Sequence, residues 1–196
     1  MKFWIIKTLL VYICLFHLSF LQSAPLAKAT GHPAMLKTAA ASPKEVIIQF
    51  LKWYKINLTK ANSFQFVKKD SAGNFMVNKP AYTRYLTFLR TSKCLSPRYI
   101  AYWQSFFDDK AIGLQSNPVQ SDIPDGFDFD LVLITQEPEL ILYHIGQTKF
   151  KTISLSDTHA VIGLSWPLEH GMQYNIEMHK GKLGWQIEYI ATPNFD

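Results

Sequence analysis

Apolar residues recur every three or four positions through the first half of the chain, at the spacing of one helix face. Ser42-Pro43 and Ser96-Pro97 each join a capping residue to a proline that suits the first helical position. Glu45 stands at the spacing of a capping box with Ser42. The pattern predicts three amphipathic helices, over residues 43–60, 80–90 and 97–109.

The hydrophobic period changes to two in the second half of the chain. Four runs of strand character are separated by polar or glycine-containing turns: 149–156, 159–166, 172–179 and 183–190. In the third run the alternating apolar residues are Met172, Tyr174, Ile176 and Met178, and in the fourth they are Leu183, Trp185, Ile187 and Tyr189. Regular alternation is typical of strands with one buried and one solvated face, so we expect an antiparallel meander.

The segments between these runs are less regular. Residues 62–78 are polar around Gly73-Asn74 and predict a loop or a short hairpin, and residues 112–130 show no repeat. Helices followed by a meander predict an α+β fold in which the helices cover the apolar face of the sheet. We expect residues 42–196 to form this single domain.

The first 29 residues resemble an export signal in their composition. Lys2 and Lys7 precede the uncharged apolar run Thr8–Leu21, which is 14 residues long and shorter than the roughly 20 residues that span a bilayer. A cut after Ala29 is preferred to one after Ala24, because Pro25 would follow the latter directly. Residues 30–41 show no periodicity and are predicted to be a flexible lead-in. The prediction is a periplasmic or secreted protein; the alternative is an uncleaved anchor.

The net charge and the cysteine content argue against two features: nucleic-acid binding and an internal disulfide. The 196 residues carry a formal charge of +5, but three lysines belong to the leader, which leaves 17 basic and 15 acidic residues. A net charge of +2 argues against a nucleic-acid-binding protein. Cys94 is the one cysteine of residues 30–196, so no internal disulfide is expected there, and the thiol is predicted to be buried.

Five short segments occur in order along residues 42–190. They are Ser42-Pro43-Lys44-Glu45 with Phe50 and Trp53-Tyr54; Leu95-Ser96-Pro97-Arg98; residues 125–130 (DGFDFD); residues 136–138 (QEP); and residues 180–187 (KGKLGWQI). Together they resemble the domain-of-unknown-function 3828 family, exported bacterial proteins with a cystatin-like (nuclear transport factor 2-like) fold. The resemblance implies a curved antiparallel sheet wrapped on a long first helix. It implies no reaction.

An acidic and aromatic stretch is the best candidate binding site. Its residues are Asp122, Asp125, Phe127, Asp128, Phe129 and Asp130. Their spacing does not match an EF-hand calcium loop. Besides cation binding, two roles remain for this stretch. It could contact a partner, or it could be structural, with the carboxylates capping turns or pairing with arginines. A paired-carboxylate hydrolase would need one buried acid with a raised pKa, and the sequence gives no sign of one.

A second candidate site is a pocket between the first helix and the sheet. Four aromatic residues would line it, with Asp128 or Asp130 as a base: Tyr54, Trp103, Trp166 and Trp185. Because the chain is 14% aromatic, we expect these rings to fill the space rather than leave it open. His159, His170 and His179 lack the spacing of zinc ligands and are predicted to be surface residues.

The sequence contains no phosphate loop, dinucleotide fingerprint or nucleophile motif, so no cofactor or metal is expected. The favoured interpretation is an exported, non-enzymatic domain that binds a protein or a small ligand. One version is an immunity-type inhibitor whose acidic loop enters a basic cleft of its partner. The alternative is an enzyme or small-ligand binder that uses the pocket. Membrane contact is expected only if the leader is retained.

Overall fold

The computed structural model describes residues 41–167 and 173–192. The predicted signal peptide, and all but the last residue of the predicted lead-in, lie outside these ranges. Among the described residues, no helix has the length and apolar character needed to span a membrane.

The first helix, α1, spans Pro43–Ala61. The predicted capping box is present, because the Ser42 hydroxyl accepts a bond from the Glu45 amide while the Glu45 carboxylate accepts one from the Ser42 amide. The helical stripe identified in the sequence is buried, with Ile47, Phe50 and Tyr54 fully inaccessible. This helix therefore contributes one face to the core along its whole length.

Helices α2 (Lys79–Arg90) and α3 (Pro97–Ser116) pack on each other. The third predicted helix was expected to end near Asp109, where polar residues interrupt the stripe, but α3 continues to Ser116. Leu114 provides the reason, because it is buried and extends the apolar face by another turn. The helix ends where the Asn117 amide donates to the Gly113 carbonyl.

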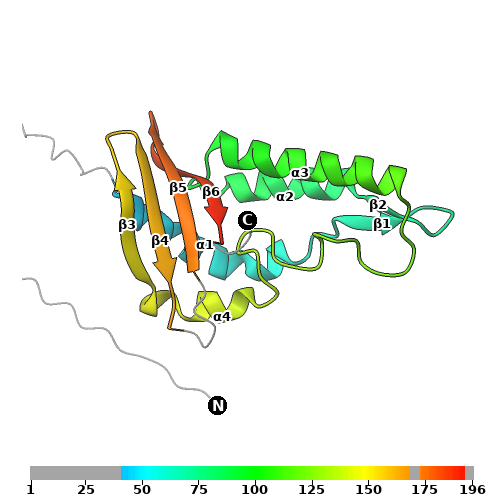
Figure 1. Ribbon diagram of the computed structural model, residues 1–196, viewed down its shortest axis with the longest axis horizontal. Coiled ribbons are helices and arrows are strands. Elements are labelled where there is room, and N and C mark those ends of the chain that lie inside the picture. The colour runs from blue at the N-terminus through cyan, green and yellow to red at the C-terminus, as the bar shows by residue number, and fades with distance from the viewer. Residues whose placement is uncertain (1–40, 168–172, 193–196) are drawn as a thin grey trace, which may run out of the picture. The chain divides into compact units, whose positions relative to one another are not determined.

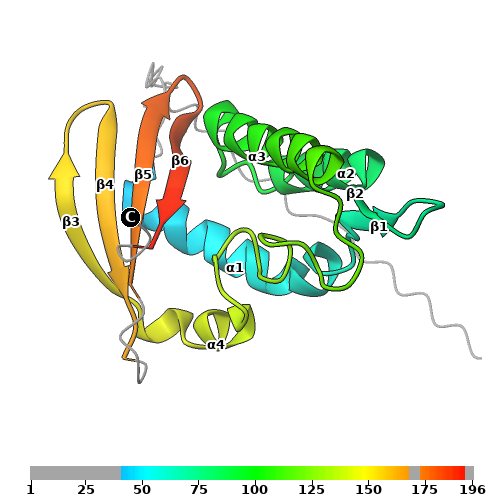
Figure 2. The ribbon, with the colours of Figure 1, turned by 45° about the vertical axis from the view of Figure 1, so that its right-hand side comes forward.

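The sheet consists of β3 (Lys149–Leu155), β4 (His159–Ser165), β5 (Gln173–Gly181) and β6 (Gly184–Ala191), paired in that order. All three pairings are antiparallel, as Figures 1 and 2 show. The predicted α+β class and antiparallel meander are confirmed. On β5 the alternation is as predicted, with Tyr174, Ile176 and Met178 buried; Met172 lies outside the described residues.

The last strand departs from the predicted alternation. Met178 is opposite Ile187, whereas Glu177 is opposite Tyr189, so a bulge leaves Glu188 as an extra residue on β6. Beyond the bulge the core position passes from Tyr189 to Ile190, which is 5% exposed. Leu183, the first predicted core residue of this run, precedes the strand and is 86% exposed. The prediction was wrong at both positions.

The helices meet the sheet in different ways. Figure 2 shows α1 crossing behind the sheet, where it contacts β4 and β6, while α3 meets β6. Residues 94–96 extend the sheet at β6, because Ile187 exchanges backbone hydrogen bonds with Cys94 and Ser96. Cys94 is buried as predicted.

The sequence pattern does not predict four of the elements individually. Strands β1 (Val67–Lys69) and β2 (Phe75–Val77) form an antiparallel hairpin, which decides between the two alternatives for residues 62–78. A short helix α4 (Pro138–Tyr143) and a 3-10 turn η1 (Ile145–Gln147) pack on α1 before the chain enters β3.

Candidate functional site

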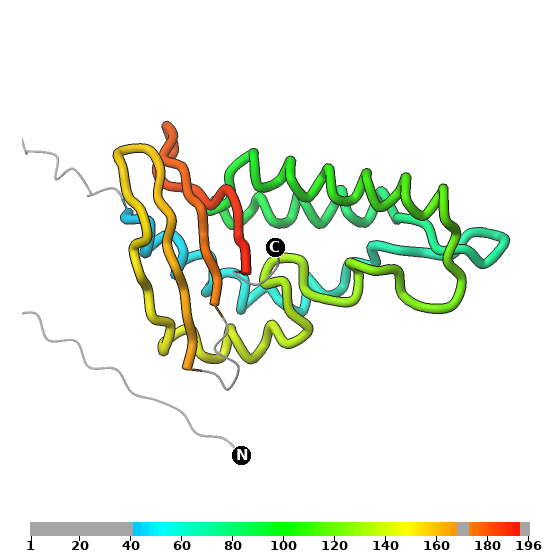
Figure 3. The backbone as a smooth tube through the Cα atoms, viewed as in Figure 1, coloured from blue at the N-terminus to red at the C-terminus, as the bar shows by residue number. Residues whose placement is uncertain are grey.

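The acidic and aromatic stretch lies in the long connection between α3 and α4. Figure 3 shows this segment leaving the end of α3, passing the β1–β2 hairpin and returning toward α1. The Phe75 amide donates to the Val119 carbonyl at 2.8 Å and ties the connection to β2. Residues 122–136 of this connection, which we call the acidic loop, carry every residue of the predicted binding site.

Gly126 sets the path of the acidic loop. Its φ of +89° lies in the region that side chains with a Cβ rarely adopt. A Cβ at this position would also come within 3.0 Å of both Lys110 Cε and Phe106 Cζ on α3. A residue with a Cβ would therefore be strained in its backbone here and would have to displace these two side chains of α3.

Asp130 is held by donors from two directions. The Tyr54 hydroxyl of α1 donates to its Oδ2 at 2.5 Å. The backbone amides of Val132 and Leu133 donate to Oδ1 at 3.0 and 2.7 Å. Asp130 also exchanges backbone bonds with residues 134 and 135, which closes a tight turn. The carboxylate therefore has a fixed position.

Burial raises the pKa of the Asp130 carboxyl above its ordinary value. The hydrogen bonds from Tyr54 and from the two backbone amides oppose this rise, and the nearby Glu139 carboxylate adds to it. Burial likewise raises the pKa of Tyr54, with Tyr85 and Asp130 as further causes. The sequence pattern predicts no desolvated acid on this loop, and the burial of Asp130 corrects that prediction.

A cavity of about 350 Å³ lies beside this pair. Six aromatic and three acidic residues contribute to its lining: Tyr54, Phe64, Phe66, Tyr85, Phe127 and Phe129, with Asp128, Asp130 and Glu139. Asn62 and Gln136 add polar amides, and no lysine, arginine or histidine is among the lining residues. We call this the Asp130 cavity. It combines apolar rings with uncompensated negative charge.

The walls of the Asp130 cavity are packed aromatic pairs. Tyr85 of α2 meets Phe64 edge-on at a centroid distance of 5.5 Å and Phe66 at 4.9 Å. Phe127 stacks on Phe107 of α3 at 6.1 Å. These contacts hold the rings in place.

A second cavity, of about 590 Å³, lies against the acidic loop and α3. Tyr102 and Trp103 of α3 and Tyr189 of β6 contribute to its lining, together with Asp125. Asp128, Phe129 and Gln136 line both cavities, so these three residues form a shared wall.

The predicted binding residues are partly brought together. Phe127, Asp128, Phe129 and Asp130 line the Asp130 cavity, and Asp125 lines the second one. Asp122 lines neither cavity and is exposed. Side chains of Asp125 and Asp128 are also exposed, whereas Phe127, Phe129 and Asp130 are half-buried.

The four aromatics of the predicted pocket are not brought together. Tyr54 lines the Asp130 cavity and Trp103 the second one. Trp166 and Trp185 are only 3% and 9% exposed and line neither. They belong to the hydrophobic core, and Trp185 also lines a further cavity beside Ser42 and Pro43. The cavity beside Asp130 lies at α1, α2 and the acidic loop instead.

Several lining residues were missed by sequence reasoning. Phe64, Phe66 and Tyr85 come from segments separated from Asp130 by 45 or more positions, and an apolar residue on a helix stripe gives no sign of facing a cavity. The described residues contain no group of three or more histidine, cysteine or carboxylate side chains placed to hold a metal ion. His170 lies outside the described residues.

Comparisons with protein-family models, with curated proteins and with solved structures gave no match. The resemblance stated from the sequence therefore stays a prediction, and the function is argued from the geometry.

Proposed function

We propose that this protein is an exported binding domain that takes up a small organic cation, such as an alkylammonium compound, in the Asp130 cavity. One observation carries the proposal: a half-buried carboxylate faces an aromatic cavity that has no basic residue among its lining side chains. The predicted leader supports export.

The chemistry of the lining favours a cation over other ligands. Aromatic faces attract ammonium groups through their quadrupoles, and the attraction strengthens when water is excluded. Asp128, Asp130 and Glu139 add negative charge on the same cavity, which repels anions. The volume of about 350 Å³ falls at the small end of the range for ligand cavities.

Asp130 is the residue expected to pair with the ligand. Tyr54 and two backbone amides orient its carboxylate, so little ordering remains to be done on binding. A bound cation also offsets the unfavourable burial of the negative charge. Affinity should therefore fall when the pH is lowered through the raised pKa of Asp130, because the protonated acid no longer attracts the cation.

Choline and its uncharged isostere 3,3-dimethylbutan-1-ol provide a matched pair of probes. Calorimetric titration should detect choline binding, and the neutral isostere should bind at least roughly tenfold more weakly, since only the charge differs. Asp130→Asn should weaken choline binding by a similar factor while it keeps the carbonyl that accepts the two backbone bonds.

Asp122→Asn is the control, because it removes one charge from the same loop outside the cavity. Equal binding of the two probes, or equal loss of affinity in the two variants, would count against the proposal.

A second candidate function is recognition of a basic protein partner, as in an immunity-type inhibitor. Asp122, Asp125 and Asp128 are exposed, and none of them forms a salt bridge with another described residue. Ile123 between them is 58% exposed. A triple asparagine variant of these aspartates, used beside wild type in a pull-down from periplasmic extract, should lose any such partner. Identical partners for both proteins would eliminate this alternative.

A further inference from the structure

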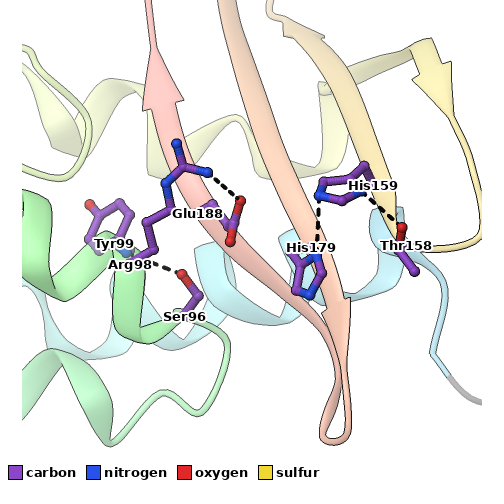
Figure 4. A network of polar contacts seen from close by, with 7 residues as sticks. All are labelled: Ser96, Arg98, Tyr99, Thr158, His159, His179 and Glu188. Atoms are coloured by element: carbon purple, nitrogen blue, oxygen red, sulfur yellow. Dashed lines mark hydrogen bonds and ion pairs between the residues drawn. The ribbon is translucent and has the colours of Figure 1, made fainter.

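A pair of histidines lies on the open face of the sheet, away from the Asp130 cavity. His159 begins β4 and is directly opposite His179 of β5 in the strand register. Their neighbours Ala160 and Met178 are buried, so the two imidazoles project from the other, solvated face. Figure 4 shows the rings pointing toward one another from the two strands.

The distance between the two facing ring nitrogens can be compared with the distance between two ligands of one metal ion. His159 Nε2 and His179 Nδ1 lie 3.3 Å apart, with the rings inclined at 57°. At this distance the two imidazoles share a long N–H···N hydrogen bond in the metal-free protein. Two imidazole nitrogens bound to one tetrahedral zinc ion at about 2.0–2.1 Å lie about 3.3 Å from each other. The separation thus matches that of a chelating pair.

The surroundings orient His159 for this role. Its Nδ1 lies 2.9 Å from the Thr158 hydroxyl, visible in Figure 4. With Nδ1 protonated and bonded to that hydroxyl, the Nε2 lone pair faces His179 and accepts its Nδ1–H until a metal ion displaces that proton. Metal-binding histidines are oriented in the same way by an acceptor at their other nitrogen.

The backbone beneath the pair is tied in place. The His159 carbonyl accepts a hydrogen bond from the Ser156 amide at 2.8 Å, and the Lys180 amide donates to the Thr158 carbonyl at 2.8 Å. The two strands therefore hold the imidazoles at chelating distance without a change in the main chain. His159 is exposed and His179 half-buried, so an ion can reach both.

We propose that His159 and His179 form a two-histidine site for a divalent transition-metal ion such as Zn²⁺, with water completing the coordination. Imidazole nitrogen favours zinc, copper and nickel over magnesium and calcium. With two protein ligands the site is an exchangeable one, in contrast to the four-ligand sites that stabilise folds. The site is independent of the Asp130 cavity and does not rest on the function proposed for it.

Calorimetric titration of the untagged, chelator-treated protein with Zn²⁺ tests the site. We expect one saturable site per chain and no response to Mg²⁺. His159→Gln and His179→Asn place an amide near the ring nitrogen that each removes, and each should weaken zinc binding at least roughly tenfold. His144→Gln is the control, since His144 is a described histidine that belongs to neither strand of the pair, and it should leave binding unchanged. The absence of a saturable site, or binding that survives both variants, would overturn the proposal, as would binding lost only in the control.

A second measurement uses the wild-type protein alone, in case the variants fold poorly. Sub-stoichiometric Cu²⁺ should broaden the amide resonances of residues around Thr158 and Lys180 before others in the nuclear magnetic resonance spectrum. Broadening that begins elsewhere would show that the ion binds at a different place.

Discussion

The Tyr54 hydroxyl donates a 2.5 Å hydrogen bond to the Asp130 carboxylate, across 76 positions of sequence. The bond joins the first helix to the acidic loop at the wall of the Asp130 cavity. Tyr54 is fully buried, so its hydroxyl needs this partner. The same contact positions the one desolvated carboxylate that the structure describes on the loop.

Tyr54→Phe should destabilise the protein. The substitution removes one donor from a half-buried carboxylate, and a hydrogen bond to a charged group contributes about 1.5–3 kcal/mol. Urea denaturation at neutral pH should show a loss of this size in the free energy of unfolding.

Tyr82→Phe is the matched control for this variant. Tyr82 donates to Asp108 at 2.8 Å, but Asp108 is exposed, and water can replace the lost donor there. Tyr82→Phe should therefore lower the free energy of unfolding by less than Tyr54→Phe does. If the two variants lose equal stability, burial of Asp130 does not strengthen the Tyr54 bond.

Asp130→Asn should change how stability depends on pH. Because burial raises the pKa of Asp130 in the folded state, the unfolded chain releases this proton first as the pH rises. The contribution of Asp130 to stability is thus most favourable below the ordinary aspartate pKa and declines up to the raised value. Asparagine cannot titrate, so the variant should gain stability relative to wild type across this window.

Denaturation series between pH 3 and pH 8 for both proteins measure the difference. The Asp122→Asn variant is the control for removing one carboxylate from an exposed position of the same loop. A constant difference between Asp130→Asn and wild type would contradict the raised pKa.

Gly126→Ala and Gly113→Ala should have opposite effects. Gly126 has a φ of +89° and two α3 side-chain atoms within 3.0 Å of a new Cβ, so alanine should destabilise by roughly 1–2 kcal/mol. Gly113 lies inside α3 with open space around it, so alanine should stabilise by about 0.5–1 kcal/mol. Thermal unfolding measures whether each variant is more or less stable than wild type. A Gly126→Ala variant as stable as wild type, or more stable, would mean that the path of the acidic loop does not depend on Gly126.

The Cys94 thiol should be unreactive in the folded protein. Burial raises its pKa to about 11, so the thiolate is a minor species at pH 8. In a Cys14→Ser background, a disulfide reagent should label Cys94 slowly under native conditions and rapidly in denaturant. Equal labelling rates under native and denaturing conditions would show that the Cys94 thiol is accessible in the folded protein.

In the β-strands, some buried positions follow from the local sequence pattern, and others depend on how the strands pair. Tyr174, Ile176 and Met178 alternate in the sequence and are buried in the fold, because a strand turns successive side chains to opposite faces. The bulge in β6 moves the core position to Ile190. Nothing local to residues 183–191 signals this, since the extra residue is defined only by pairing with β5.

At the candidate site, too, the sequence pattern predicts part of the arrangement and the tertiary structure decides the rest. The acidic loop stood out in the sequence because aspartates and phenylalanines alternate along it, but its residues turned out to have different roles. Asp122 is exposed to water, while Asp130 is bonded to Tyr54. Likewise, the spacing of His159 and His179 predicts surface residues without a shared site, whereas the strand register makes them direct neighbours.

Helix and strand periodicity, the capping signals at Ser42 and Ser96, and the order of elements were sufficient to predict the α+β class. These features depend on residues within a few positions of one another, which is the range over which periodicity and capping act. The Asp130 cavity, the desolvated carboxylate and the histidine pair join residues from distant segments. Only packing of the whole chain decides such contacts, because desolvation and the distances between side chains are properties of the folded state.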